Sequence, residues 1–133
     1  MKLASLDLGL KRIGVAICVD GKVSCPLTAI IRKNRNQASR DVDKFLEEWG
    51  IEGLVVGVPK GGSSEEEMGR RIKHFISLLT FKGEIFYQDE YGTSYEAVEL
   101  MVESQNNKKN RKDGKLDSIS AKLILDRWLE FRN

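Results

Sequence analysis

Histidine and cysteine are scarce in this chain of 133 residues. His74 is the only histidine, and Cys18 and Cys25 are the only cysteines. These three residues cannot supply the four ligands of a usual zinc finger. They also leave no Ser-His-Asp or Cys-His catalytic set, because the one histidine lies between Lys73 and Phe75 in an expected helix. We interpret His74 as a surface residue.

The chain also lacks long apolar runs and a strong net charge. No run approaches the roughly 20 apolar residues that cross a bilayer, and Met1–Asp7 does not resemble a secretory signal. We therefore expect a cytoplasmic protein with no membrane partner. Hydrophobic residues make up 41% and charged residues 32%, with a net charge of +2, which is typical of globular proteins. The length suits one domain over residues 1–133.

Positive charge is nevertheless concentrated in two segments. Residues 106–115 form the basic polar stretch NNKKNRKDGK, and Arg70, Arg71 and Lys73 form a second cluster in an expected helix. Each cluster could bind a polyanion or simply be a solvated face, and the residues alone leave both explanations open.

Strand-like and helix-like segments alternate along the chain. Strands are expected over residues 3–8, 13–19, 22–28, 51–58 and 84–88. Helices are expected over residues 37–49, 64–79, 93–103 and 116–131. The order β-β-β-α-β-α-β-α-α predicts an α/β fold with a five-stranded mixed sheet, an antiparallel meander of three strands plus two parallel strands, flanked by helices. The last helix should face inward with Ala121, Ile124, Leu125, Trp128 and Phe131.

The Asp20-Gly21 pair predicts a two-residue hairpin turn between the second and third strands. In that register Cys18 faces Val23 and Ala16 faces Cys25, so the cysteines lie diagonally on one face. Their α-carbons would be too far apart for an unstrained disulfide, and we expect reduced core thiols. Pro26 indicates that the third strand is an edge strand.

Three acidic positions lie where a carboxylate is costly or directed. Asp7 is inside an otherwise apolar strand, where an ionised group is expensive without a compensating cation. Glu90, preceded by Asp89, follows a strand end, where α/β sheets usually bind ligands. Asp117 opens the last helix, whose dipole favours an ionised acid, and it shares a face with apolar residues of that helix.

Carboxylates that converge repel one another unless a cation lies between them. Magnesium prefers oxygen ligands, and two such ions roughly 4 Å apart can hydrolyse phosphodiesters. Ordinary explanations also exist: Asp117 could be a helix-start acid and Asp89-Glu90 a turn, whereas Asp7 has no routine structural role. The residues predict a divalent-metal site in a small α/β domain and leave the substrate open.

Four blocks resemble the YqgF/RuvX family. Residues 7–16, DLGLKRIGVA, resemble its opening signature, and residues 55–59, VVGVP, resemble its second block. Asp89-Glu90 followed by Thr93 resembles the third block, and residues 115–125, KLDSISAKLIL, resemble the last. The blocks occur in the family's order over essentially the whole chain.

The resemblance implies an RNase H-like nuclease whose Mg²⁺ or Mn²⁺ is held by Asp7, Glu90 and Asp117. Members of the family are described as Holliday-junction resolvases or as nucleases that mature the 5′ end of pre-16S ribosomal RNA. The expected partner is therefore nucleic acid, either precursor RNA or branched DNA. Junction cleavage needs two active sites, most simply a homodimer, whereas RNA trimming needs one, so monomer and homodimer both stay open.

The same resemblance indicates residues that contact the substrate. Arg12 and Lys115 are the candidates for gripping its phosphates, and Thr93 belongs to the same set. Gly9 would let the backbone turn closely around the site, as would Gly14.

One position departs from the family pattern. Where the family usually carries arginine directly after the third block's Asp-Glu, this chain has Tyr91. The change removes a bidentate phosphate contact. Tyrosine could instead stack on an unpaired base, which favours single-stranded or RNA substrates.

Two other classes of function are compatible with parts of the sequence. The Tyr91 departure is also what a non-catalytic nucleic-acid-binding module would show, although such a module gains little from three acids. A nucleotide-phosphate enzyme would explain the glycine-containing loop over residues 57–64. That loop lacks the Gly-Lys-Ser/Thr order of a Walker motif, and actin-like kinases need two such domains.

Overall fold

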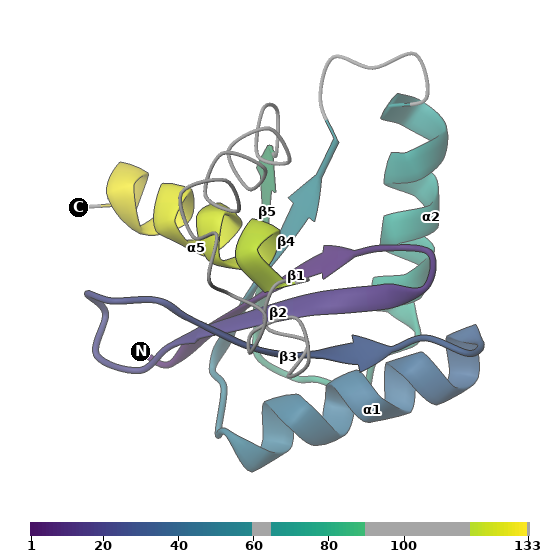
Figure 1. Ribbon diagram of the computed structural model, residues 1–133, viewed down its shortest axis with the longest axis horizontal. Coiled ribbons are helices and arrows are strands. Elements are labelled where there is room, and N and C mark those ends of the chain that lie inside the picture. Colours follow the sequence, from purple (N-terminus) through teal and green to yellow (C-terminus); the bar gives the residue numbers. More distant parts are fainter. Residues whose placement is uncertain (60–64, 90–117, 133) are drawn as a thin grey trace, which may run out of the picture.

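A computed structural model of the chain describes residues 1–59, 65–89 and 118–132. Its elements are, in chain order, β1 (Leu3–Leu8), β2 (Arg12–Cys18), β3 (Cys25–Ile31), α1 (Arg35–Glu48), β4 (Gly53–Val58), α2 (Glu65–Ser77), β5 (Glu84–Asp89) and α5 (Ile119–Arg132) (Figure 1). The helix expected over residues 93–103 and the basic stretch 106–115 lie outside the described residues. No helix in the described part of the chain is long and apolar enough to cross a bilayer.

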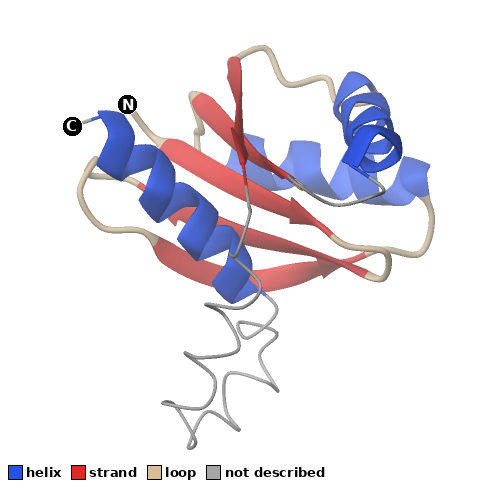
Figure 2. Ribbon diagram, turned by 90° about the horizontal axis from the view of Figure 1, so that it is seen from above, coloured by secondary structure: helices blue, strands red, loops and turns tan. Residues whose placement is uncertain are grey.

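The strands form one five-stranded sheet in the order β3-β2-β1-β4-β5. The central strand β1 is antiparallel to β2 and parallel to β4, and β5 continues the parallel half. Figure 2 shows α5 on one face of this sheet and both α1 and α2 on the other. The predicted mixed sheet is therefore confirmed, and so is the edge position of β3, which contains Pro26.

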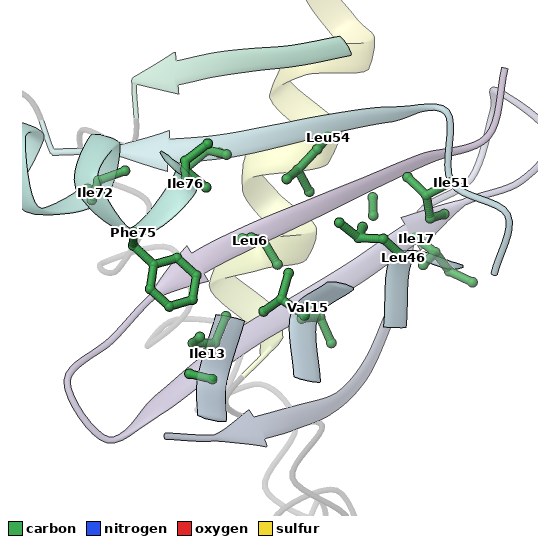
Figure 3. Close-up of a cluster of buried hydrophobic side chains, with 14 residues drawn as sticks. Leu6, Ile13, Val15, Ile17, Leu46, Ile51, Leu54, Ile72, Phe75 and Ile76 are labelled. Atoms are coloured by element: carbon green, nitrogen blue, oxygen red, sulfur yellow. The ribbon is translucent and has the colours of Figure 1, made fainter. Parts of the chain in front are cut away.

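Alternation along β1 divides the core between the two faces. Ala4 and Leu6 point toward α1 and α2, where they join the larger apolar cluster (Figure 3). Leu3 points the other way, into a smaller cluster beneath α5. Because successive residues of a strand face opposite sides, Ser5 and Asp7 share the α5 face with Leu3.

The start of α1 shows a cap that the apolar spacing alone did not predict. Asn34 accepts a hydrogen bond from the Gln37 backbone at 2.8 Å, and the Gln37 side chain accepts from the Asn34 backbone. This capping box satisfies backbone donors that the first turn leaves unpaired. The helix therefore begins at Arg35, earlier than the expected residue 37. It is followed by Gly50, whose φ of +62° suits glycine.

The hairpin predicted at Asp20-Gly21 is wrong. The observed register pairs Ala16 with Pro26, so β3 begins at Cys25 and a longer loop joins the strands. The Asp20 carboxylate causes this, because it accepts backbone hydrogen bonds from Lys22 at 2.8 Å and Val23 at 3.0 Å. The bonds from Val23 and then Lys22 hold the Asp20 pKa below its usual value.

The new register also separates the two cysteines. Cys18 is buried beneath α5, whereas Cys25 pairs with Ile17, faces the other side of the sheet and is exposed. The expectation of core thiols is correct for Cys18 and wrong for Cys25. Both thiols are free, as expected.

The inward face of α5 is as predicted except at its end. Ala121, Ile124 and Leu125 are fully buried, and the Trp128 ring packs on Phe86 of β5 with a centroid separation of 4.4 Å. Phe131 is 77% exposed, which contradicts its expected inward position. It comes after the last residue of α5 that packs on the sheet.

Candidate active site

Asp7 lies near the carboxyl end of the central strand, on the face covered by α5. The burial of β1 falls along the strand, and Asp7 is half-buried. Two residues earlier on the same face, Ser5 is completely buried. A carboxylate at this depth in a sheet is costly to ionise without compensation, which is the physical reason for its prominence in the sequence.

Both strands beside Asp7 place glycine on its face. In β2 the partner of Asp7 is Gly14. In β4, Val55 belongs to the cluster beneath α5, so Gly57 faces the same side next to β1. The positions beside Asp7 in both neighbouring strands are therefore glycines, which leave room next to the carboxylate.

Two buried hydrogen bonds fix the start of α5 above this part of the sheet. The Val15 backbone N–H donates to the Ser118 hydroxyl at 3.0 Å, and the Ser5 hydroxyl donates to the Ala121 carbonyl at 2.6 Å. The first bond lies beside an irregularity in the ladder, where two residues of β3 oppose Gly14 alone. Because these bonds are directional, they set the position of α5 more narrowly than apolar contact does.

Neither serine was identified from the sequence. Ser5 alternates with Asp7, which was a usable signal, and Ser118 directly follows the predicted ligand Asp117. Their burial depends on a helix more than 100 residues away from the strands it covers, with separations of 116 and 103 residues. Such a contact leaves no local pattern.

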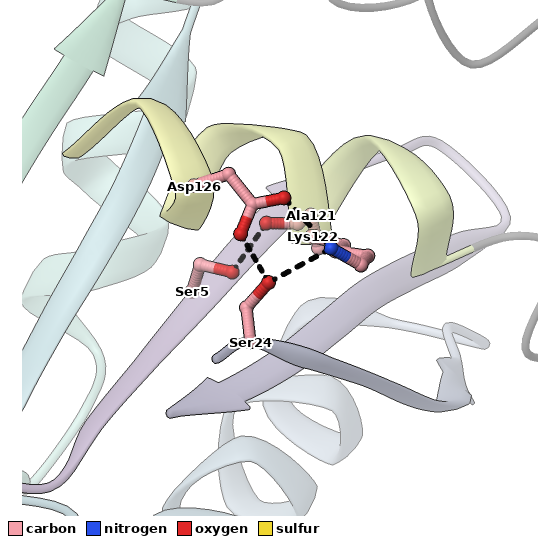
Figure 4. A network of polar contacts seen from close by, with 5 residues as sticks. All are labelled: Ser5, Ser24, Ala121, Lys122 and Asp126. Atoms are coloured by element: carbon pink, nitrogen blue, oxygen red, sulfur yellow. Dashed lines mark hydrogen bonds and ion pairs between the residues drawn. The ribbon is translucent and has the colours of Figure 1, made fainter. Parts of the chain in front are cut away.

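A second polar group holds the middle of α5 to the loop before β3. The Lys122 ammonium donates to Ser24 at 3.2 Å and to Asp126 at 2.8 Å, and the Ser24 hydroxyl donates to Asp126 (Figure 4). Figure 4 shows this group on the same side of the helix as the Ser5–Ala121 bond. The α5 helix is thus attached to β1, to β2 and to the β2–β3 loop.

The loop between β1 and β2 turns as tightly as predicted for Gly9. The Gly9 backbone N–H donates a hydrogen bond to the Arg12 carbonyl at 3.1 Å. A β-carbon at this position would lie 2.5 Å from that same oxygen, so only glycine fits. Arg12 follows as the exposed first residue of β2, and strand alternation puts it on the face of Gly14 and Asp7.

At the end of β5, neighbouring side chains point to opposite faces. Phe86 packs on α5, whereas Lys73 of α2 lies 5.9 Å from the Tyr87 ring centroid. By the same alternation, Gln88 faces the α5 side with Asp7, and Asp89 faces α2. Asp89 is therefore not placed to share a site with Asp7.

The other predicted site residues lie outside the described ranges. These are Glu90, Tyr91, Thr93, Lys115 and Asp117. Within residues 1–59, 65–89 and 118–132, no three His, Cys, Asp or Glu residues gather as a metal site. The structure thus describes one predicted metal ligand, Asp7, and one predicted phosphate contact, Arg12.

Comparison with known proteins decides the family. The RuvX family, described as Holliday junction resolvase, matches residues 1–131. The chain belongs to the RuvX family. A relative from Sulfurovum sp. is 61% identical over 129 residues, covering 97% of this chain and 98% of its own, and one from Campylobacter jejuni subsp. doylei is 55% identical over 125 residues, covering 94% of each. Both are named "Putative pre-16S rRNA nuclease".

Solved structures show that this RuvX chain has an RNase H-like fold. Thermus thermophilus RuvC in complex with a Holliday junction substrate aligns with a TM-score of 0.65, covering 100% of this chain and 97% of its own. Sequence identity is only 12%, so the likeness concerns the fold. The YqgF/RuvX resemblance of the four sequence blocks and the fold it implied are both confirmed.

Proposed function

We propose that this RuvX protein is a magnesium-dependent endonuclease that matures the 5′ end of pre-16S ribosomal RNA. The observation that carries the proposal is the carboxylate of Asp7, half-buried at the carboxyl end of the central strand and bordered by glycines. The substrate comes from the relatives at 61% and 55% identity, whose names specify it. Manganese would satisfy the same oxygen ligands.

The described neighbours of two further acids support their assignment as ligands with Asp7. Ser118 is hydrogen-bonded to Val15, the residue after the β2 partner of Asp7, and Asp117 directly precedes Ser118. Glu90 directly follows β5, whose carboxyl end lies at the same edge of the sheet as that of β1. An all-oxygen set of this kind suits magnesium.

In this proposal the protein's own residues bind and orient the substrate. Arg12 and Lys115 bind phosphates of the substrate, Tyr91 stacks on an unpaired base, and Thr93 belongs to the same set of substrate contacts. Magnesium held by Asp7, Glu90 and Asp117 would supply the activation of a water and the stabilisation of negative charge that phosphodiester hydrolysis needs. The Ser5–Ala121 and Val15–Ser118 hydrogen bonds keep α5 in register with β1.

The test compares two aspartates at the same edge of the sheet. Asp7→Asn should lower the rate of 5′-end cleavage of a labelled pre-16S RNA fragment by roughly a thousandfold or more, because it removes a metal-binding charge. Asp89→Asn, which alters a carboxylate facing α2, should stay within about threefold of the wild-type rate. Both proteins should melt like the wild type, and chelating the metal should abolish cleavage by all three.

An Asp7→Asn protein that cuts at the wild-type rate would end the proposal. If Asp7→Asn and Asp89→Asn reduced the cleavage rate equally, the site would include carboxylates from both the α5 face and the α2 face of the sheet. Isothermal titration with Mg²⁺ and Mn²⁺ provides a second readout, in which Asp7→Asn should weaken metal binding and Asp89→Asn should not.

Holliday junction resolution is the second candidate, because the family description names it and the fold matches RuvC bound to a junction. Symmetric cleavage of a four-way junction needs two active sites. The same preparations should be assayed on a junction and on the precursor RNA, with sedimentation to give the oligomeric state. Faster junction cleavage by a dimer would favour this candidate over RNA maturation.

A further inference from the structure

A cleft of about 450 Å³ lies on the opposite side of the sheet from Asp7. It is formed by the β1–β2 loop, the start of α1 and the face of α2 next to them. Arg32, Arg35, Arg70 and Arg71 line it together with Leu8 and Leu10. We refer to it as the arginine cleft. Its α2 arginines belong to the basic cluster that the sequence left without an assignment.

Positive charge in the arginine cleft is only partly compensated. None of the described residues that line it is acidic. Arg71 forms an ion pair with Glu67 at 2.8 Å on the exposed surface of α2. The side chains of Arg35 and Arg70 form no hydrogen bond or ion pair with any other residue in the described ranges. Arg35 and Arg70 line the same cleft and form no ion pair among the described residues, so their charge suits an anionic ligand.

The fourth arginine of the cleft, Arg32, is held in place by two contacts. The Arg32 guanidinium lies 5.3 Å from the centroid of the Phe75 ring, and its Nη1 donates to the Gly9 carbonyl at 3.1 Å. Both contacts restrict the side chain, so its plane is set before any ligand binds. A fixed guanidinium plane is a surface on which nucleic-acid bases stack.

The cleft and the Asp7 face meet at the β1–β2 loop. Leu8 follows Asp7 in β1 and points into the cleft, whereas Asp7 points to the α5 face. Leu10, at the tip of the loop, is 79% exposed and lines the cleft, and Arg12 returns to the Asp7 face. A single nucleic-acid strand that passed around this loop would contact both the arginine cleft and the Asp7 face.

We propose that the arginine cleft binds a single-stranded segment of the RNA that flanks the cleavage site. The inference rests on the proposed function, because that function supplies the polyanion. The volume suits about one or two nucleotides and is too small for a duplex. Phosphates lie between Arg35 and Arg70, and one base stacks on Arg32 against the apolar wall of Leu8 and Leu10.

Binding is measured by fluorescence anisotropy on the full-length protein in chelator, so that the result does not depend on cleavage. The probe is a labelled single-stranded RNA with the 5′-flanking sequence. Arg35→Gln combined with Arg70→Gln should weaken binding about tenfold near 0.1 M salt and flatten the salt dependence by about 1.4 in log–log slope, for two lost phosphate contacts. The charge-matched control is Arg40→Gln combined with Lys82→Gln, which alters exposed residues that do not line the cleft.

Equal loss in the two double variants would overturn the proposal, since it would indicate general electrostatics. No loss in the cleft variant would overturn it too, as would weakened binding confined to a duplex probe. Photocross-linking of 4-thiouridine RNA gives the position, and adducts within residues 8–10 or 68–75 are expected. Adducts found only elsewhere would contradict the proposal even if Asp7→Asn abolishes cleavage, so the two proposals fail separately.

Discussion

The two faces of the sheet differ in the side chains that they bury. Toward α1 and α2 the buried side chains form a large cluster of apolar residues, including Leu6, Leu54 and Phe75. Toward α5 the cluster is smaller, and buried hydroxyls of Ser5 and Ser118 lie within it. The α1–α2 face buries more apolar side chains. The α5 face buries fewer, carries the Asp7 carboxylate and positions its helix by hydrogen bonds. The larger apolar cluster and the Asp7 carboxylate therefore lie on opposite faces of one layer of strands.

The largest stability loss is expected from the apolar face. Phe75→Ala should lower the free energy of unfolding by about 3–5 kcal/mol, because Phe75 is a large, almost fully buried side chain and leaves a cavity. Phe131→Ala removes the same side chain from an exposed position and should change stability by less than about 0.5 kcal/mol. Urea unfolding measures both, and similar losses would contradict the assignment of the core to this face.

A substitution on the α5 face is expected to lower the free energy of unfolding less than Phe75→Ala does, but to reduce the cleavage rate. Ser118→Ala leaves the buried Val15 N–H without its acceptor, which should cost about 1–3 kcal/mol. Cleavage should fall further than this loss of stability explains, since α5 is released near Asp7. Ser39→Ala is the control, because the buried Ser39 hydroxyl donates to the Asn36 carbonyl of its own helix at 3.0 Å and has no other bond within the described ranges. Activity that is unaffected in folded Ser118→Ala protein would show that the bond is not needed to position the site.

The loop shared by both faces can be tested with two glycines. Gly9→Ala forces a β-carbon to 2.5 Å from the Arg12 carbonyl and should cost about 1–3 kcal/mol. It should also reduce both cleavage and RNA binding, because the loop borders both surfaces. Gly69→Ala, in α2 with open space around the new β-carbon, should stabilise the protein by about 0.5–1 kcal/mol. Thermal and urea unfolding should show a lower free energy of unfolding for Gly9→Ala and a higher one for Gly69→Ala. Destabilisation by both substitutions would contradict the steric explanation for Gly9.

The smallest expected effect is a difference in alkylation rate between the two thiols, which is measured on the unaltered protein. Burial beneath α5 raises the pKa of the Cys18 thiol. At a pH near 8 it therefore holds less of the reactive thiolate than an exposed cysteine does. Cys25, exposed on the other side of the sheet, should be alkylated by iodoacetamide at least about tenfold faster than Cys18. Peptide mass spectrometry over time gives both rates, and equal rates would mean that the α5 face opens readily.

The parts of the fold that follow from local periodicity could be predicted from the sequence. The bounds of β1 and the mid-strand position of Asp7 were both apparent, since alternation is a property of a few adjacent residues. The tight turn at Gly9 was implied by the family resemblance instead. The resemblance of four blocks then gave the correct family.

The parts that depend on distant contacts could not be predicted. The β2–β3 register is set by the Asp20 side chain and by Ser24, which bonds to α5 102 residues later. The two serine anchors of α5 join segments still farther apart, and the arginine cleft combines residues from five separate elements or loops. In the site itself, the separation of Asp89 from Asp7 became clear only from the strand register.

The long reach of the α5 anchors has a consequence during synthesis. The hydrogen bonds that close the Asp7 face join β1 and β2 to residues 116 and 103 positions later, so they form only after α5 has left the ribosome. The apolar face lacks this delay, because β1, α1, β4 and α2 all precede residue 78. A nascent chain can thus bury its larger apolar cluster early while the Asp7 face stays unassembled. The face that carries Asp7 is therefore completed only with α5, the last element of the described fold.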